Sequence, residues 1–141
     1  ENFSTLIKIL KNDNFTIFVI GNTEKEKQRG QYLKRNLEII DLTGKLSFKD
    51  LLYLISNSDI YLGFDSGPLH LASLTHTPIV ALYGPNIPEI SGPWRKNNVT
   101  ILQANLNCRP CSQKKCIYDT IRCIEDIKLD DVYKAIKQYI Y

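Results

Sequence analysis

The sequence predicts an α/β fold, in which helices cover both faces of a parallel sheet. Hydrophobic periodicity switches repeatedly between the helical and the strand pattern along the chain. The predicted strands are short and almost wholly apolar, as is typical of parallel strands buried on both faces. The length of 141 residues corresponds to about one domain, and 43% hydrophobic with 23% charged residues is ordinary globular usage. Disordered and low-complexity proteins are thereby excluded.

The first part of the chain predicts two helices that alternate with two strands. The helices are expected over residues 2–12 and 24–36, and the strands over residues 15–20 and 38–42. Apolar residues from Phe3 to Leu10 recur at helical spacing, which makes the first helix amphipathic. The β-branched and aromatic run FTIFVI predicts a buried strand that ends at Gly21.

The same alternation continues until residue 83 and then stops. Ser47 with Asp50 resembles a capping box that opens a third helix. After it we expect a strand over residues 59–64, a helix over 68–75, a strand over 78–83, a loop over 84–98, a strand over 99–103, a cysteine-bearing segment over 105–123 and a helix over 129–140. No internal repeat and no linker divides the chain.

Charge and hydropathy speak against a membrane-spanning segment and against nucleic acid as a partner. No apolar run approaches the ~20 residues that span a bilayer. The net charge is only +3, and the lysines are interleaved with acidic residues, which excludes nucleic acid as a partner. The sequence contains no methionine, even at its first position, and residues 1–12 show no signal-peptide pattern. We therefore expect a fragment of a longer protein.

The segment GFDSGPLHLA, residues 63–72, predicts an anion-binding turn where a strand ends and a helix begins. Ligands of open α/β sheets bind outside the carboxyl ends of the strands. Ser66 or Gly67 is expected to be the N-cap, and Pro68 suits the first helical position. Backbone N–H groups of this turn would bind phosphate. Asp65 could accept hydrogen bonds from sugar hydroxyls, and His70 could donate one to a phosphate oxygen.

Each of these residues also has a purely structural explanation. Ser66 alone could be a helix cap, and His70 alone a half-buried histidine; their occurrence together with Asp65 favours a ligand site. A serine hydrolase is excluded, because the Gly-x-Ser-x-Gly pattern fails at Phe64 and Pro68.

Residues 65–94, DSGPLHLASLTHTPIVALYGPNIPEISGPW, resemble the C-terminal-domain signature of glycosyltransferase family 9, the ADP-heptose:lipopolysaccharide heptosyltransferases. The family usually shows D-[ST]-G-x-x-H-[LI]-A, then G-P-T-x-P and a Gly-Pro-aromatic element. The likeness extends downstream through the cysteines and upstream to residues 21–26 and to the Thr43–Ser47 loop. Asn86 stands where the family usually has threonine, so no hydroxyl role is expected there.

The resemblance implies a GT-B enzyme of two Rossmann-like domains facing a cleft, and it implies that residues 1–141 form the domain that binds the nucleotide-sugar donor. Asp65 would hold the sugar, and Ser66 and Gly67 the diphosphate with support from His70. Glu24, or alternatively Glu26, would hold the ribose, and Lys45, Leu46 and Ser47 would line the base. Arg95 and Lys96 are weaker candidates for contact with the acceptor or the leaving group, and more simply surface charges.

The resemblance also implies what lies outside the chain. The family's first C-domain strand with a phosphate-contacting lysine loop, the acceptor domain and its acidic catalytic base are expected to be missing, so that no catalytic residue is assigned here. The parent would transfer a heptose-like sugar from an ADP-sugar to a lipid-linked saccharide, without any cofactor. It would work in the cytoplasm at the inner face of the bacterial inner membrane, with peripheral membrane association possible.

Four cysteines, Cys108, Cys111, Cys116 and Cys123, are spaced x2, x4 and x6. A C-x2-C pair followed by two more cysteines can form a tetrahedral zinc site, although the second pair is wider than in most zinc knuckles. A structural cluster of thiols is the simpler expectation. Two further functions therefore stay open: a nonenzymatic nucleotide-binding domain, and an interaction module stapled by its cysteines.

Overall fold

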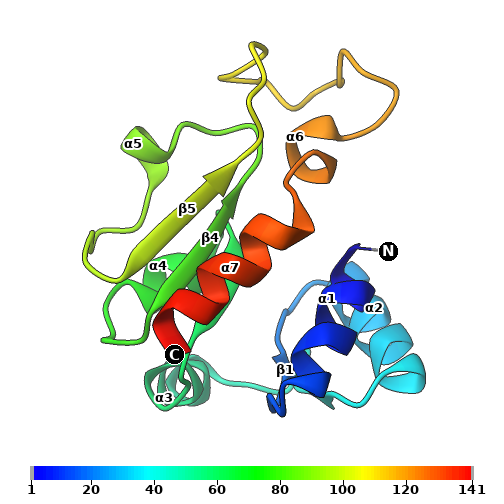
Figure 1. Ribbon diagram of the computed structural model, residues 1–141, viewed down its shortest axis with the longest axis vertical. Helices are drawn as coiled ribbons and strands as arrows, with labels where there is room; N and C mark the ends of the chain where they lie inside the picture. Colours follow the sequence, from blue (N-terminus) through cyan, green and yellow to red (C-terminus); the bar gives the residue numbers. More distant parts are fainter. Residues whose placement is uncertain (1, 141) are drawn as a thin grey trace. The chain divides into compact units, whose positions relative to one another are not determined.

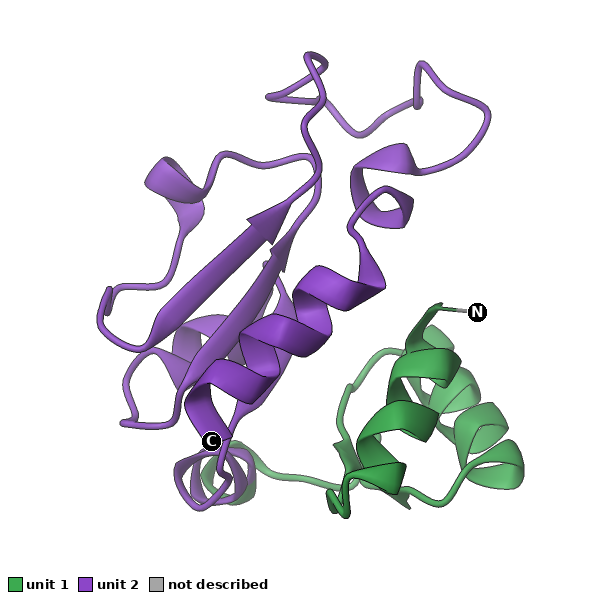
Figure 2. Ribbon diagram, in the orientation of Figure 1, with its two compact units in different colours: residues 1–50 green, residues 51–141 purple. Residues whose placement is uncertain are grey.

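The computed structural model describes residues 2–140 (Figure 1). The chain divides into two compact units, residues 1–50 and 51–141 (Figure 2). The division falls inside helix α3, Phe48–Ser56, which is why no linker composition marks it in the sequence. Within residues 2–140, no helix combines the length and the hydrophobicity that a bilayer-spanning segment requires.

The first unit contains two helices and a two-stranded parallel sheet. Its elements are α1 (Asn2–Asn12), β1 (Phe18–Val19), α2 (Glu24–Asn36) and β2 (Ile40–Asp41). Helix α1 buries Leu6, Ile7 and Leu10, as the apolar periodicity predicts. Helix α2 begins at a complete capping box formed by Thr23 and Glu26.

The expectation of a buried strand over residues 15–20 is wrong. Only Phe18 and Val19 are strand residues, and Phe18 is 42% exposed. Its register partner Ile40 is 43% exposed, so the two side chains form an uncovered part of the same sheet face. A continuous apolar run does not by itself distinguish a strand covered on both faces from one covered on a single face.

The second unit is built on a three-stranded parallel sheet in the order β3–β4–β5. The strands are β3 (Tyr61–Phe64), β4 (Ile79–Tyr83) and β5 (Val99–Gln103). Every residue of the central strand β4 is buried. Helix α7 (Leu129–Ile140) lies in front of this sheet and α4 (Gly67–Ala72) behind it in Figure 1. Both faces of β4 are therefore covered, as the fold class requires.

Further segments differ from the sequence expectation: the strands expected over residues 38–42 and 59–64 are shorter, Ile40–Asp41 and Tyr61–Phe64. Short helices interrupt both predicted irregular regions, namely α5 (Pro88–Ser91) and α6 (Arg122–Glu125). Helix α4 ends at Ala72, three residues early, because the side chains that follow return to its backbone: Ser73 Oγ donates to the His70 carbonyl at 2.7 Å. Such bonds compete with continuation of a helix.

Candidate functional site

The β3–α4 turn lies at the carboxyl end of β3, where the sequence predicts it. Ser66 is the N-cap in an extended conformation, which confirms one of the two predicted caps. Its hydroxyl donates to the Phe64 carbonyl at 3.1 Å and caps no helical N–H. Gly67 is the first helical residue, so Pro68 comes one position later than predicted. A Cβ at Gly67 would meet nothing within 4 Å, and a ligand could therefore approach this backbone closely.

The Asp65 carboxylate is the best-connected polar group of this turn. Its Oδ2 accepts hydrogen bonds from Asn86 Nδ2 at 2.6 Å and Ser91 Oγ at 3.0 Å. Its Oδ1 lies 3.6 Å from His70 Nε2. The Asp65 side chain is 16% exposed, whereas that of His70 is 50% exposed. The structure thus brings the predicted pair Asp65 and His70 together and adds two residues.

Asn86 and Ser91 were not predicted as site residues. The sequence marks Asn86 only as a departure from the family pattern, and nothing in it distinguishes Ser91. Both lie in the segment that follows β4, where the sequence predicts an irregular loop. Tyr83, at the end of β4, donates its hydroxyl to the Ser91 carbonyl at 2.9 Å. Burial, followed by the nearby negative charge of Asp65, raises the pKa of Tyr83, so this hydroxyl stays a donor.

A buried tyrosine supports the turn from within β3. Burial raises the pKa of Tyr61 to about 12, while a hydrogen bond with Ser66 opposes that shift. The chain passes so close to the phenol that a Cβ at Gly63 would lie 2.4 Å from Tyr61 Oη. A side chain at position 63 would therefore displace the tyrosine or the turn.

The two glutamates proposed for the ribose have different surroundings in the first unit. Glu26 Oε2 accepts hydrogen bonds from Asn22 N at 2.9 Å and from Thr23 N and Oγ1, each at 2.8 Å. These bonds, chiefly the one from the Thr23 backbone, lower the pKa of Glu26. Glu24 is exposed and lies 3.9 Å from Lys27 Nζ. The capping box therefore engages Glu26 and leaves Glu24 the more accessible carboxylate.

The predicted base-side loop makes mainly local contacts. Lys45 Nζ donates to the Asp41 carbonyl at 2.6 Å. Ser47 donates hydrogen bonds from its hydroxyl and its backbone N–H to the Asp50 carboxylate at the start of α3, and these bonds lower the pKa of Asp50. The Ser47 hydroxyl in turn accepts one from the Asp50 backbone N–H. Leu46 is partly buried. All three belong to the first unit, and the β3–α4 turn belongs to the second.

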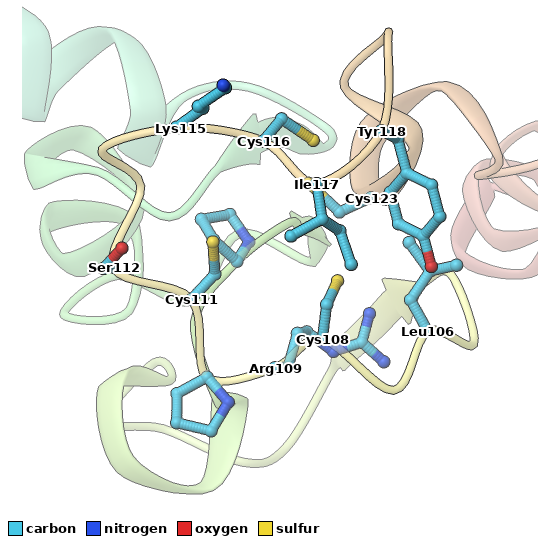
Figure 3. Close-up of a pocket in the computed structure, with 12 residues that line it drawn as sticks. Leu106, Cys108, Arg109, Cys111, Ser112, Lys115, Cys116, Ile117, Tyr118 and Cys123 are labelled. Atoms are coloured by element: carbon cyan, nitrogen blue, oxygen red, sulfur yellow. The ribbon is translucent and has the colours of Figure 1, made fainter.

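The four cysteines line one cavity of about 230 Å³ (Figure 3). All four are free thiols. Burial, then the neighbouring thiols, raises the pKa of Cys123. Within residues 2–140, no three His, Cys, Asp or Glu side chains are grouped so that they could hold a metal ion. The cysteines therefore share a cavity wall.

The cysteine segment is attached to the end of β4. Cys111 N donates to the Pro85 carbonyl at 3.3 Å, and Gln113 Nε2 donates to Asn86 Oδ1 at 3.2 Å. Arg95 lies elsewhere. Its guanidinium donates to the carbonyl of Thr77, which precedes β4, at 2.6 Å. That is the amino end of the parallel strands, so the Arg95 guanidinium is not beside Asp65.

Comparison with known proteins gives one consistent family. The model of glycosyltransferase family 9 (heptosyltransferase) matches residues 1–122. The chain is 32% identical over 140 residues to lipooligosaccharide heptosyltransferase 2 of Campylobacter jejuni, covering 97% of this chain and 42% of that protein. It is 29% identical to lipopolysaccharide heptosyltransferase 1 of Pseudomonas aeruginosa, covering 76% of this chain and 29% of that protein. The chain thus spans less than half the length of these relatives.

Solved structures agree on the fold. A glycosyl transferase family 9 structure from Veillonella parvula superposes with a TM-score of 0.80 at 21% identity, covering 99% of this chain and 40% of that one. The structure of E. coli heptosyltransferase WaaC with ADP superposes with a TM-score of 0.76 at 18% identity, covering 98% of this chain and 38% of that one. Since the family model matches most of the sequence, the chain belongs to glycosyltransferase family 9, the heptosyltransferase family.

Proposed function

We propose that this chain is the donor-binding part of a GT-B heptosyltransferase, which transfers a heptose from an ADP-sugar to a lipopolysaccharide core acceptor. The family and the names of the relatives support the reaction class, and a solved relative is described with ADP. The observation on which the proposal rests is the Asp65 carboxylate at the end of β3. One oxygen of it is fixed by two donors, and the other lies 3.6 Å from His70 Nε2.

The turn offers a separate group for each part of the donor. Asp65 Oδ1 can accept a hydrogen bond from a sugar hydroxyl. The backbone N–H groups of Ser66 and Gly67 can bind the diphosphate, and His70 can donate a further hydrogen bond to it. As the glycosidic C–O bond breaks, negative charge builds up on the leaving diphosphate. Donors already in place stabilise this charge, so the proposed step needs no cofactor.

The remaining expected contacts belong to the nucleoside. Glu24 is the better candidate for the ribose, because Glu26 is engaged in the capping box. Lys45, Leu46 and Ser47 would line the base. The acceptor would be a lipid-linked saccharide held by another part of the enzyme. Activity would take place in the cytoplasm, at the inner face of the inner membrane, with peripheral membrane association.

Calorimetric titration of the 141-residue chain with ADP and with ADP-heptose tests the proposal. Asp65→Ala should leave ADP binding nearly unchanged and weaken ADP-heptose binding about tenfold, the value of one hydrogen bond to a charged group. His70→Ala should weaken the binding of both ligands, because the proposed His70 contact is with the diphosphate that both contain.

The exposed residues Asp59 and His76 provide matched controls, since Asp59→Ala and His76→Ala should change neither affinity. A wild-type chain that binds neither ligand would refute the proposed function. A chain that binds ADP alone would favour the nonenzymatic nucleotide-binding domain.

A further inference from the structure

The Asp65 carboxylate is held asymmetrically. Two donors, Asn86 Nδ2 at 2.6 Å and Ser91 Oγ at 3.0 Å, converge on Oδ2. Oδ1 lies 3.6 Å from His70 Nε2, which is beyond normal hydrogen-bond length, and Tyr83, whose hydroxyl donates to the Ser91 carbonyl, also faces the Asp65 carboxylate. A carboxylate side chain rotates readily about its last torsion, which is broad and roughly two-fold. Two bonds to one oxygen stop that rotation and decide which oxygen remains available.

Asn86 is itself fixed from the other side. Its Oδ1 accepts from Gln113 Nε2 at 3.2 Å, and its backbone carbonyl accepts from Gln103 Nε2 at 2.8 Å. A carboxylate only accepts hydrogen bonds, so the atom of Asn86 that faces Asp65 must be the NH₂ group. The carbonyl end of the same amide then faces Gln113. The cysteine segment and β5 thus orient Asn86, and Asn86 orients Asp65.

We propose that Asn86 is a positioning residue for the donor sugar: by holding Oδ2 of Asp65, it presents Oδ1 to a sugar hydroxyl. This inference rests on the proposed function, because it concerns the sugar part of the same donor site. Ser91 contributes the second and longer bond to Oδ2. Neither residue needs to touch the donor for this effect.

A simple structural role for Asn86 makes a different prediction. If its bonds only tie the loop after β4 to the β3–α4 turn, their loss lowers stability and affects ADP and ADP-heptose equally. If they orient Asp65, their loss affects ADP-heptose selectively. The quantity to measure is therefore the ratio of the ADP-heptose affinity to the ADP affinity, with the thermal unfolding temperature measured in parallel.

Two substitutions of Asn86 test this ratio in the 141-residue chain. Asn86→Ala removes the NH₂ group that donates a hydrogen bond to Asp65. The ratio of the ADP-heptose affinity to the ADP affinity should then fall about tenfold, while the ADP affinity stays within about twofold. Asn86→Asp keeps the shape but places a second carboxylate against Asp65, so at pH 8 the ratio should fall at least as far. Asn57→Ala is the matched control, because Asn57 Nδ2 makes an exposed bond of 2.8 Å to the Tyr53 carbonyl. It should leave the ratio unchanged.

The pH dependence of Asn86→Asp adds a readout that loop stability would not produce. Two carboxylates this close share one proton, and the shared proton restores a hydrogen bond to Asp65. The ratio for Asn86→Asp should therefore recover at least threefold from pH 8 to pH 5 relative to wild type. The other titratable groups facing Asp65 are His70 and Tyr83, and the wild-type titration corrects for both.

The outcomes separate this inference from the proposed function. A wild-type chain that binds neither ligand overturns both. A wild-type chain with a clear preference for ADP-heptose, together with Asn86 variants of unchanged ratio, overturns the positioning role alone. If Asn86→Ala does not fold, the isosteric Asn86→Asp decides the question through its pH profile, and a flat profile counts against the proposal.

Discussion

Removing one hydroxyl group, in Tyr61→Phe, tests how β3 supports the donor-binding turn. Tyr61 is only 8% exposed, and Ser66 near its hydroxyl counteracts part of the rise in the Tyr61 pKa. We predict that Tyr61→Phe lowers the free energy of unfolding at pH 8 by about 1 kcal/mol, the usual net value of a hydrogen bond made by a buried hydroxyl. The ring and its packing remain, so no cavity is formed.

The larger effect appears at high pH. Burial raises the pKa of Tyr61 to about 12 from 10.0 in the unfolded chain. Because the folded-state pKa is the higher one, the stability that depends on the protonated phenol is complete below pH 10 and is lost as the pH rises toward 12. At roughly 1.4 kcal/mol per pKa unit, the free energy of unfolding of wild type should fall by about 2–3 kcal/mol over this range. Tyr61→Phe has no phenol at this position and should not show this fall.

Urea unfolding followed by circular dichroism at pH 8, 9, 10 and 11 measures this difference. All other tyrosines ionise in both proteins and cancel. The higher unfolding free energy of wild type should shrink above pH 10, and Tyr61→Phe should become the more stable protein close to pH 11. At that pH, ionisation of Tyr61 in the unfolded chain destabilises wild type by as much as its hydroxyl stabilises it. Tyr53→Phe is the control: its side chain is 73% exposed, so the difference from wild type should not vary with pH.

A difference in unfolding free energy between wild type and Tyr61→Phe that stays constant from pH 8 to pH 11 would contradict the raised pKa of Tyr61. It would mean that the phenol ionises equally easily in the folded and unfolded states. The tight packing of Tyr61 Oη against Gly63, and with it the support of the turn, would then be wrong.

Two further predictions concern other parts of the chain. Burial favours a raised pKa for Asp41, but two hydrogen bonds from Thr43 outweigh the effect of burial and hold this pKa below 3.8. Thr43→Val, which removes the bond from the hydroxyl, should therefore lower the free energy of unfolding by about 1–3 kcal/mol at pH 7. A lowered folded-state pKa stabilises the protein fully only above the unfolded-state pKa of Asp41, and this stability is lost as the pH falls. Urea unfolding at pH 3 should therefore show a smaller difference in unfolding free energy between Thr43→Val and wild type than at pH 7. An equal difference at both pH values would contradict the lowered pKa of Asp41. Among the thiols, exposed Cys116 should react with a disulfide reagent at pH 8 before Cys123, whose pKa is raised by burial. Mass spectrometry of partly labelled protein gives the order, and Cys123 reacting first would show that it is not shielded.

Local patterns in the sequence predicted much of the fold. The helices over residues 2–12, 24–36 and 129–140 and the strand over residues 99–103 have the expected bounds. Amphipathic spacing and capping residues act within a few positions, which is why a single sequence reveals them. The closeness of Asp65 and His70 is local for the same reason, since one turn of chain separates them.

Packing between distant parts of the chain decides which apolar side chains are exposed and where the short helices α5 and α6 form. The same apolar character that predicts the fully buried β4 also predicts a buried strand over residues 15–20, where Phe18 is in fact exposed. Periodicity reports which residues are apolar, and tertiary packing decides which faces are covered. The four cysteines are likewise close in sequence, yet only the fold shows that all four line one cavity.

The α/β class, the family likeness and the position of the β3–α4 turn follow from local patterns in the sequence. How the Asp65 carboxylate is held depends on the fold, because Asn86 and Ser91 are 21 and 26 residues away along the chain. The physical link is the register of the sheet. Phe64 pairs with Leu82, so the carboxyl ends of parallel β3 and β4 lie side by side, and the residues that follow each strand meet at one edge.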